Sequence, residues 1–319
     1  MYHIIVNPAS KSGRAIKIWN EIKLELKRRS VIYKEYLTKG MGDASKIAME
    51  LTNQMGADYI SIIVLGGDGT MNEVVQGIKD FEKTKVSYIP TGSSNDLARA
   101  LKIHQNPIKA LDLILNGKRC IKMDVGVIKY KPSVIGFGED DEGDLVTRRF
   151  CVSSGIGFDA AVCQDALTSN IRNICNRIGL GKLTYLGIAL KQLLTAPTIS
   201  CSLYLDGKEK VYLEKFLFIA SMIHPYEGGG FLFCPKALDD DGLLDLCVVG
   251  KMSKMKMLCV LPTAFFGKHT GFKDIYEYRA KEITIQTSSP LWIHTDGEVP
   301  GQTSNITITC LEEKLNLYY

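Results

Sequence analysis

The stretch YISIIVLGGDGTMNEVV, residues 59–75, decides the fold class of this 319-residue chain. Residues 59–65 are nearly all apolar, which is typical of a strand buried on both faces of a sheet. A glycine-rich loop, residues 66–70, follows at once, and a helical pattern begins near Met71. A buried strand that leads through a short loop into a helix predicts a parallel sheet covered by helices.

The same alternation continues on both sides of this stretch. Within the first 123 residues it predicts strands at 2–6, 31–37, 59–65 and 86–89, and helices at about 14–29, 43–55, from 71 and at about 95–101. From about residue 124, strand-like runs follow one another at 125–130, 150–154, 200–205, 211–220, 244–249, 283–287 and 306–311, with helices near 183–194 and 253–266. We therefore expect an α/β nucleotide-binding domain with a parallel sheet over residues 1–123 and a β-rich, sandwich-like domain over residues 124–302. The C-terminal segment, about 303–319, is a candidate to pack back on the first domain.

The composition is that of an ordinary globular protein. The chain is 45% hydrophobic and 23% charged, which excludes wholesale disorder. No apolar run reaches the roughly 18 residues that a membrane span needs, and the N-terminus lacks the basic and apolar regions of a signal peptide. The nine cysteines are scattered without a C-x-x-C pair, so we expect reduced, packing cysteines. These features predict a soluble, cytosolic protein that meets any lipid at a membrane surface.

Positive charge is concentrated in the first 123 residues. They hold 19 Lys and Arg against 12 Asp and Glu, a net charge of +7, whereas the remainder holds 20 against 23. A basic half suits a polyanionic ligand such as a nucleotide, or an anionic membrane face. A solvated helix face at residues 27–29 accounts for part of the excess. No nucleic-acid partner is expected.

The glycine loop carries the strongest chemical signal. Gly66, Gly67 and Gly69 let backbone N–H groups approach a ligand without a Cβ atom in the way, and the following helix adds partial positive charge. Both features favour a phosphate. Asp68 is informative because a carboxylate beside phosphates is repulsive unless Mg²⁺ bridges them or the carboxylate handles a proton. The alternative is a tight strand-to-helix turn that needs glycine for its geometry alone.

Two further loops follow predicted strands. Residues 7–14 (NPASKSGR) come after the first strand and offer hydroxyls, a glycine and two cations. Residues 90–96 (PTGSSND) come after the fourth strand, where a helix begins. The carboxyl ends of parallel strands lie at one edge of a sheet, where the ligands of such folds bind. Either loop taken alone is equally well explained by helix capping.

Four sets of residues together resemble the diacylglycerol kinase catalytic family, which includes bacterial soluble lipid kinases and the sphingosine and ceramide kinases. They are NPxSxSG at 7–13, TxxxGDA at 38–44, GGDGTMNEVV at 66–75 and PxGSxNDLARAL at 90–101. GGDGT by itself is shared with NAD kinases and phosphofructokinases, whereas the first and last sets narrow the resemblance to lipid kinases. The resemblance resumes in GGGF at 228–231, CPKALDDDGLLD at 234–245 and TDGE at 295–298, and it is weakest from about 129 to 200.

The resemblance implies a set of site residues. Asp296 and Glu298 match the family's catalytic-base region, with Glu298 favoured as the proton acceptor and Asp296 as its partner or a route to Mg²⁺. Residues 291–295 form a strand-like run before these carboxylates, and Gly297 permits a turn after it. If the segment stays extended, both carboxylates face one side and can share the role of proton acceptor, whereas a turn leaves that role to one of them. A structural Mg²⁺ site would use the backbone carbonyls of Leu238 and Leu243 and the carboxylate of Asp241. The nucleotide, ATP, would contact Asn7, Ser10, Lys11, Ser12, Gly13, Arg14, Thr38, Gly66, Gly67, Asp68, Gly69, Thr70, Met71, Asn72 and Ser93, the last at a position where the family commonly has threonine.

Other patterns have simpler interpretations. Residues 155–160 (GIGFDA) match a dinucleotide-binding GxGxxA pattern, but no Asp or Glu stands near the required offset, so a strand-to-helix turn is favoured. The helix expected near 183–194 is apolar enough for a core helix or for a lip over a lipid site. The five histidines are dispersed and are expected to be structural or at the surface.

The resemblance implies an ATP-dependent lipid kinase that converts diacylglycerol to phosphatidic acid, with Asp68 holding Mg²⁺ on the phosphates. The alternatives are a kinase of another lipid alcohol (a sphingoid base, ceramide or phosphatidylglycerol), an NAD-kinase-like enzyme, and a nucleotide-binding module without turnover. The protein is expected in the cytoplasm, reaching its lipid by peripheral association with the inner membrane surface. A homodimer is left open.

Overall fold

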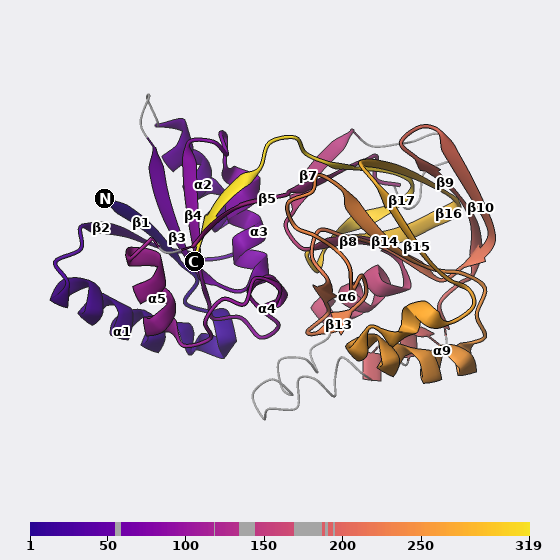
Figure 1. Cartoon of the computed structure of the whole chain (residues 1–319), viewed down its shortest axis with the longest axis horizontal. Helices are drawn as coiled ribbons and strands as arrows, with labels where there is room; N and C mark the ends of the chain where they lie inside the picture. Colours follow the sequence, from indigo (N-terminus) through magenta and orange to yellow (C-terminus); the bar gives the residue numbers. More distant parts are fainter. Residues whose placement is uncertain (55–58, 118, 134–143, 169–186, 189–190, 194) are drawn as a thin grey trace. The chain divides into compact units, whose positions relative to one another are not determined.

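The fold is described from a computed structural model, which covers residues 1–54, 59–117, 119–133, 144–168, 187–188, 191–193 and 195–319. The chain divides into two compact units (Figure 1). The first comprises Met1–Val125, Gly228–Gly230 and Leu311–Tyr319, and the second comprises Gly126–Glu227 and Phe231–Cys310. Within the residues described, no helix combines the length and apolar character needed to cross a membrane.

The first unit is built on a six-stranded sheet with the order β2-β1-β3-β4-β18-β5. All neighbours run parallel except β5, which is antiparallel to β18. The strands are β1 (Tyr2–Val6), β2 (Tyr33–Leu37), β3 (Ile60–Gly66), β4 (Thr84–Pro90), β5 (Cys120–Met123) and β18 (Leu315–Tyr318). The predicted α/β architecture with a parallel sheet is confirmed, and the four predicted strands are β1 to β4.

Helices cover both faces of this sheet (Figure 1). α1 (Ala15–Arg28) buries Ala15, Trp19, Ile22 and Leu26, whose spacing of three to four residues places them on one side of the helix. This side packs with α5 (Pro107–Leu115) against one face of the strands. α2 (Asp43–Asn53) and α3 (Asp68–Gly77) pack against each other on the opposite face, and α4 (Asp96–Ala100) follows β4.

The second unit contains a ten-stranded antiparallel sheet. Its order is β15-β14-β11-β8-β16-β17-β6-β7, and β9 joins it through β16 and carries β10. The strands are β6 (Gly126–Tyr130), β7 (Val146–Phe150), β8 (Ser153–Gly157), β9 (Ile199–Leu205), β10 (Glu209–Phe216), β11 (Phe218–Met222), β14 (Leu244–Val249), β15 (Ile275–Ala280), β16 (Glu282–Thr295) and β17 (Glu298–Cys310). A separate two-stranded ribbon pairs β12 (Tyr226–Glu227) with β13 (Phe231–Leu232). The predicted β-rich character is confirmed.

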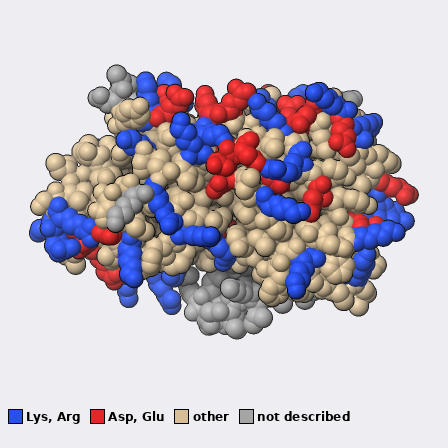
Figure 2. Space-filling view, viewed as in Figure 1, with Lys and Arg blue, Asp and Glu red and all other residues tan. Residues whose placement is uncertain are grey.

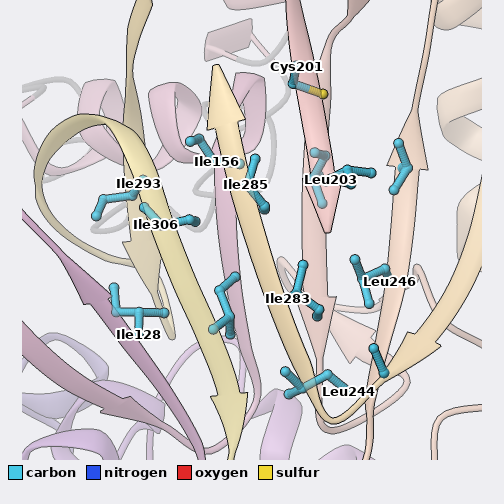
Figure 3. Close-up of a cluster of buried hydrophobic side chains, with 14 of the residues drawn as sticks. Ile128, Ile156, Cys201, Leu203, Leu244, Leu246, Ile283, Ile285, Ile293 and Ile306 are labelled. Carbon is cyan, nitrogen blue, oxygen red and sulfur yellow. The ribbon is translucent and has the colours of Figure 1, made fainter. Parts of the chain in front are cut away.

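The core of this sheet follows the period of two that strands impose on their side chains. Ile283 and Ile285 of β16 and Ile306 and Ile308 of β17 are fully buried, whereas Thr284 between the first pair is not. Figure 3 shows Ile283, Ile285 and Ile306 among apolar side chains of neighbouring strands. Side chains of α6 (Phe158–Thr168), α9 (Lys254–Val260) and the 3₁₀ helix η2 (Leu261–Phe266) belong to a second apolar cluster of this unit. A further 3₁₀ helix, η3 (Lys268–Gly271), follows η2.

Some expectations fall at or beyond the limits of the described residues. The sequence EDDEGD at 139–144 is typical of a solvated loop, and it lies outside them except for Asp144. The helix expected near 183–194 is described only at 187–188 and 191–193. The helix expected at 253–266 is α9 continued by η2. Residues 311–319 belong to the first unit, whereas 303–310 belong to β17 of the second. Eight of the nine cysteines are described, and none of the eight forms a disulfide.

Candidate functional site

Three loops of the first unit meet at the carboxyl ends of β1, β3 and β4. The side chain of Asn7, directly after β1, donates from Nδ2 to Oγ1 of Thr70 in the first turn of α3, which follows β3 (3.0 Å). Ser10 donates from Oγ to the carbonyl oxygen of Thr91 in the loop after β4 (2.8 Å). The Thr91 N–H in turn donates to the carbonyl oxygen of Gly66 (2.7 Å). The loops that the sequence predicts at one edge of the sheet are therefore joined by hydrogen bonds.

The glycines of these loops serve the protein's own packing as well as any ligand. A Cβ atom on Gly92 would lie 2.6 Å from Cα of Gly67 and 2.7 Å from Oδ1 of Asn95, so the two loops approach each other closely only because both positions are glycine. α3 begins at Asp68 without a capping side chain from Gly67, its N-cap residue. The first-turn N–H groups of such a helix form a positive end that suits a phosphate.

Asp68 is held at this edge by specific contacts. Its Oδ2 accepts the Asp96 N–H (2.9 Å), and the Tyr88 hydroxyl lies 3.4 Å from its Oδ1. Burial, together with the charge of Asp68, raises the pKa of Tyr88 well above 10.0, so the hydroxyl keeps its proton and can donate. Asp96 is itself buried, pairs with Arg99 and accepts the Gly229 N–H (2.7 Å). The carboxylate of Asp68 is thus oriented by backbone and side-chain donors, and it is half-buried.

The remaining predicted nucleotide contacts differ in exposure. Met71 and Asn72 are fully buried in α3, so a contact with a ligand would have to come from their backbone. Thr38, directly after β2, is also buried, and its N–H donates to the carbonyl oxygen of Val6 (2.9 Å). The side chain of Ser12 lies outside the described ones. Among the predicted contacts in the loops after β1 and β4, Lys11, Gly13, Arg14 and Ser93 are exposed.

In the second unit, Asp296 and Gly297 form the two-residue turn between β16 and β17. Both have positive φ angles (49° and 82°), which is typical of a tight hairpin turn, and Thr295 pairs with Glu298 across it. The sequence leaves open whether this segment is extended or forms a turn. The structure has a turn, because the chain is not extended through Asp296. The two predicted catalytic carboxylates therefore point into different surroundings.

The carboxylate of Asp296 is bound to a neighbouring loop. It accepts the N–H groups of Cys151, Val152 and Ser153 at 2.8, 2.8 and 3.0 Å. Three backbone donors on one carboxylate stabilise its ionised form and fix the hairpin to the start of β8. Glu298, one residue past the turn, pairs with Arg148 of β7 and is half-buried.

The acidic turn at 238–243 is engaged by a cation of the protein itself. Oδ1 of Asp241 accepts the Leu243 N–H (3.0 Å), and its Oδ2 pairs with Arg279 of β15. Nε of Arg279 also lies 3.1 Å from Oδ1 of Asp245. Leu238 is exposed. In this arrangement both oxygens of Asp241 are occupied and a guanidinium stands beside them, so the donor set does not fit a Mg²⁺ ion unless Arg279 moves away.

The second unit also holds a cluster that pattern analysis of the sequence does not find. Nε2 of His294 on β16 lies 3.0 Å from Oε1 of Glu227 and 3.2 Å from Oδ2 of Asp159 in the first turn of α6. His294 is fully buried, and the side chains of Asp159 and Glu227 are only 10% and 12% exposed. The Gly297 N–H lies 3.4 Å from Nδ1, which is too long to decide the protonation of the ring. Burial by itself lowers the pKa of His294, but the charge of Glu227 and the hydrogen bond to Asp159 outweigh it and raise the pKa well above 6.5.

This cluster gives the GIGFDA pattern a structural reason. A Cβ atom on Gly155 would overlap Oδ2 of Asp159 and lie 2.5 Å from Nε2 of His294, so the pair can meet only over a glycine. The interpretation of the pattern as a strand-to-helix turn is confirmed, since β8 ends at Gly157 and α6 begins at Phe158. The sequence predicts that the histidines are structural or lie at the surface, and it does not indicate that His294 is the centre of an ionic cluster. The signal that could have indicated the cluster is the position of its members: Asp159 lies within GIGFDA, Glu227 directly precedes GGGF and His294 directly precedes TDGE. No regular spacing connects the three residues.

Comparison with known proteins connects these features to a family. Residues 1–128 match the family model described as "Diacylglycerol kinase catalytic domain", and residues 152–319 match one described as "YegS C-terminal NAD kinase beta sandwich-like domain". "Putative lipid kinase YtlR" of Bacillus subtilis (strain 168) is 30% identical over 302 residues, which are 95% of this chain and 94% of that protein. A "Diacylglycerol kinase" of Mycobacterium tuberculosis (strain ATCC 25618 / H37Rv) is 28% identical over 295 residues, which are 92% of this chain and 87% of that protein. The crystal structure of a "putative diacylglycerol kinase" from Bacillus anthracis str. Sterne has a TM-score of 0.74 at 25% identity, and covers all of this chain and 94% of that chain.

Proposed function

This chain belongs to the diacylglycerol kinase catalytic family, a family of lipid kinases, and from that premise we propose that it transfers the γ-phosphate of ATP to diacylglycerol, which yields phosphatidic acid. The observation that carries the proposal is the joined edge of the first sheet. There, the glycine loop, the N-terminus of α3 and the loop after β1 meet around an oriented Asp68. The choice of diacylglycerol is supported by the names of relatives that are 26–28% identical over 92–94% of this chain.

We assign the binding of the nucleotide phosphates to this edge. The first-turn N–H groups of α3 would bind phosphate oxygens, and the exposed cations Lys11 and Arg14 would offset their charge. Asp68 fits a Mg²⁺ ion because it is a half-buried oxygen donor beside that helix terminus, and Mg²⁺ prefers such donors. When bound, Mg²⁺ would neutralise part of the charge on the transferred phosphoryl group. The backbone donor from Asp96 would keep the Asp68 carboxylate oriented throughout.

We assign the proton chemistry to Glu298 and a positioning role to Asp296. In the proposed step the hydroxyl proton of the lipid passes to the Glu298 carboxylate while the hydroxyl oxygen forms a bond to the γ-phosphorus and ADP leaves with the electron pair of the broken bond. The pairing with Arg148 favours an ionised Glu298, which is the form that accepts a proton. Asp296 is already saturated by three backbone donors, so it is better suited to hold the hairpin than to exchange protons.

The cellular setting of the proposed reaction follows from its two substrates. A long-chain diacylglycerol resides in a bilayer, and ATP is present in the cytoplasm. We therefore propose a cytoplasmic enzyme that associates peripherally with the inner face of the membrane.

The test is direct. The purified chain is incubated with ATP labelled at the γ-phosphate, Mg²⁺, NAD and a panel of lipid alcohols in mixed micelles, with the Asp68→Asn variant as a control. We expect label in phosphatidic acid, formed at least about a hundredfold more slowly by the variant. Label in the phosphate ester of another lipid would support lipid kinase activity but show that diacylglycerol is not the substrate. Label only in a water-soluble product such as NADP, or no label at all, would overturn the proposal.

A further inference from the structure

One segment of the second unit combines positive charge with exposed aromatic side chains. Residues 250–273 contain five lysines and neither an aspartate nor a glutamate. They form α9, η2 and η3 in succession. In Figure 2 the corresponding lower right part of the surface shows tan and blue residues and no red. Since the second half of the chain as a whole carries more acidic than basic residues, this local excess is specific to the segment.

The inward side of the segment fixes it to the body of the unit. Met257, Val260 and Ala264 are buried in an apolar cluster with side chains of the large sheet. η2 is followed by Gly267, whose φ of +66° suits glycine, and a Cβ atom there would lie 2.8 Å from Cγ of Pro235. The outward side chains are therefore presented by a firmly packed backbone.

The outward side of the segment carries both exposed apolar side chains and exposed lysines. Phe266 is 75% exposed and Met255 is 70% exposed, and Phe265 and Phe272 are also exposed. Phe265 stacks on the ring of Phe231 with 4.0 Å between the ring centroids, which leaves Phe266 as the more freely projecting ring. The exposed lysines of the segment are Lys251, Lys254, Lys268 and Lys273.

This combination matches the chemistry of an anionic bilayer surface. Aromatic and long apolar side chains enter the boundary between headgroups and acyl chains, while lysines extend their stems along it and place their ammonium groups beside phosphates. A second copy of the same surface would meet it with like charge. An acidic protein partner would satisfy the lysines but would leave the projecting phenylalanine and methionine without a hydrocarbon environment.

We propose that residues 251–273 form the surface by which the protein docks on anionic phospholipid membranes, with Met255 and Phe266 inserted and Lys251, Lys254 and Lys268 against the headgroups. The proposal rests on the proposed function, since it supplies the contact through which an enzyme of a membrane lipid would reach its acceptor. Docking in this way adds apolar and electrostatic contributions, so it should weaken in high salt without vanishing.

The experiment is flotation of the full-length protein with vesicles of phosphatidylcholine, with and without about 30 mol % phosphatidylglycerol as the anionic component. We expect binding to anionic vesicles at least about tenfold tighter than to neutral ones. Two docking variants are compared: Met255→Ser combined with Phe266→Ser, and Lys251→Glu combined with Lys254→Glu and Lys268→Glu. Each should weaken binding to anionic vesicles by about tenfold or more, and the charge variant should also lose the dependence on salt.

Matched controls carry the same chemical changes elsewhere. Leu24→Ser combined with Ile32→Ser replaces two apolar side chains of the first unit that are 71% and 72% exposed. Lys129→Glu, Lys208→Glu and Lys215→Glu together reverse three exposed charges of the second unit. Thermal melting verifies that every variant is folded. The proposal is overturned if the docking variants bind like the unsubstituted protein, or if the controls lose as much. It is also overturned if the docking substitutions change the oligomeric state without lipid, because the surface is then a contact between copies.

Kinase assays separate this proposal from the proposed function. A short-chain diacylglycerol below its micelle-forming concentration needs no membrane contact, so the docking variants should phosphorylate it at the unsubstituted rate. With long-chain diacylglycerol in anionic vesicles their rate should fall in proportion to the loss of binding. If the unsubstituted protein floats with anionic vesicles but phosphorylates neither lipid, the proposed function fails and the docking surface stands.

Discussion

His294 and Glu227 form the shorter contact of a buried ionic cluster, with 3.0 Å between Nε2 and Oε1. Asp159 approaches the same nitrogen at 3.2 Å, so two carboxylates share one imidazole. Even with a protonated ring the cluster carries a net charge of −1 in a site with little access to water. Loss of the ring proton would leave two carboxylates without a cation, which explains why the pKa of His294 is raised despite its burial.

The first prediction concerns the pH dependence of stability. The pKa of His294 is raised above 6.5 in the folded protein, so its stabilising contribution is complete below about pH 6.5 and is lost as the pH rises through the folded value. We expect the free energy of unfolding, measured by urea titration, to fall above about pH 6.5 by up to about 1.4 kcal/mol per pH unit from this group. His294→Gln should remove that slope and cost about 3–5 kcal/mol at acidic pH, because the buried carboxylates lose their cation.

The control for this prediction is His104→Gln, which changes a histidine at the surface. It should leave the pH profile unchanged. If the profiles of the unsubstituted protein and of His294→Gln run parallel, the ring is neutral in the folded state and the interpretation of the cluster is wrong.

Gly155 provides a second test of the same cluster. An added methyl group would overlap Asp159 and crowd His294, and both are fixed by α6 and β16. We expect Gly155→Ala to lower the free energy of unfolding by about 1–3 kcal/mol, the usual cost of overpacking, and to weaken the pH dependence assigned to His294. Gly40→Ala is the matched control, because a Cβ atom at Gly40 meets nothing within 4 Å. Equal stability of the two variants would mean that the close approach at Gly155 is not required.

Much of the fold follows from local sequence patterns. The apolar run at 59–65 corresponds to β3, and the glycines after it lie where α3 begins. These features could be predicted because a strand buried on both faces requires consecutive apolar residues and a tight turn requires glycine. β16 is continuous from Glu282 to Thr295, whereas the sequence predicts two separate strand-like runs, at 283–287 and at 291–295. Polar residues and Pro290 interrupt the pattern there, and the pairing with β17 shifts register between Gln286 and Leu291. α5 is not predicted, although Asn106 caps it and Pro107 occupies its first turn.

In the candidate site, too, the features that depend on local patterns could be predicted and those that depend on distant partners could not. The loops of the first unit could be placed together because parallel strands carry their carboxyl ends to one edge. The surroundings of Asp296 and His294 could not, because they depend on partners far away in the sequence. Asp296 contacts residues 151–153, and His294 contacts Asp159, which is 135 positions earlier. No periodicity or motif spacing encodes such contacts.

Asp68→Asn should abolish most turnover while keeping the fold. The amide retains an oxygen that can accept the Asp96 N–H, which is 2.9 Å from Oδ2 in the native site, but it loses the negative charge proposed to hold Mg²⁺. We expect kcat to fall by about a hundredfold or more with little change in melting temperature. Asp80→Asn, which changes an acidic residue that accepts the Lys83 N–H in a turn before β4, should keep its activity. Near-native turnover in Asp68→Asn would refute the assigned role.

The predicted metal site at Leu238, Asp241 and Leu243 must compete with Arg279. Because Arg279 pairs with Asp241, we expect Mg²⁺ to raise the melting temperature of the unsubstituted protein only slightly. Arg279→Gln removes the competing charge, so it should enlarge the effect of Mg²⁺, and Asp241→Ala in that background should abolish it. Melting curves with Mg²⁺ and with a chelator measure this. An effect of Mg²⁺ that is the same in all three proteins would place the ion elsewhere.

The last prediction separates the two carboxylates of the β16–β17 hairpin. Glu298→Gln keeps the size of the side chain and removes its ability to take a proton, so kcat at saturating ATP and lipid should fall by about 10²- to 10⁴-fold while ATP affinity and melting are retained. Asp296→Asn should instead act through structure. Its amide nitrogen would face one of the three backbone N–H groups from which the carboxylate now accepts hydrogen bonds, and we expect a loss of about 1–3 kcal/mol in the free energy of unfolding.

Arg148→Gln provides the control, because it removes the cation beside Glu298 and leaves both carboxylates in the protein. It should shift the pH profile of kcat to higher pH, since an unpaired carboxylate ionises less readily. If Asp296→Asn is the variant that loses turnover at unchanged stability, the two roles are reversed. If neither substitution lowers kcat, the proton must pass to Asp68, and only Asp68→Asn should then alter the pH profile.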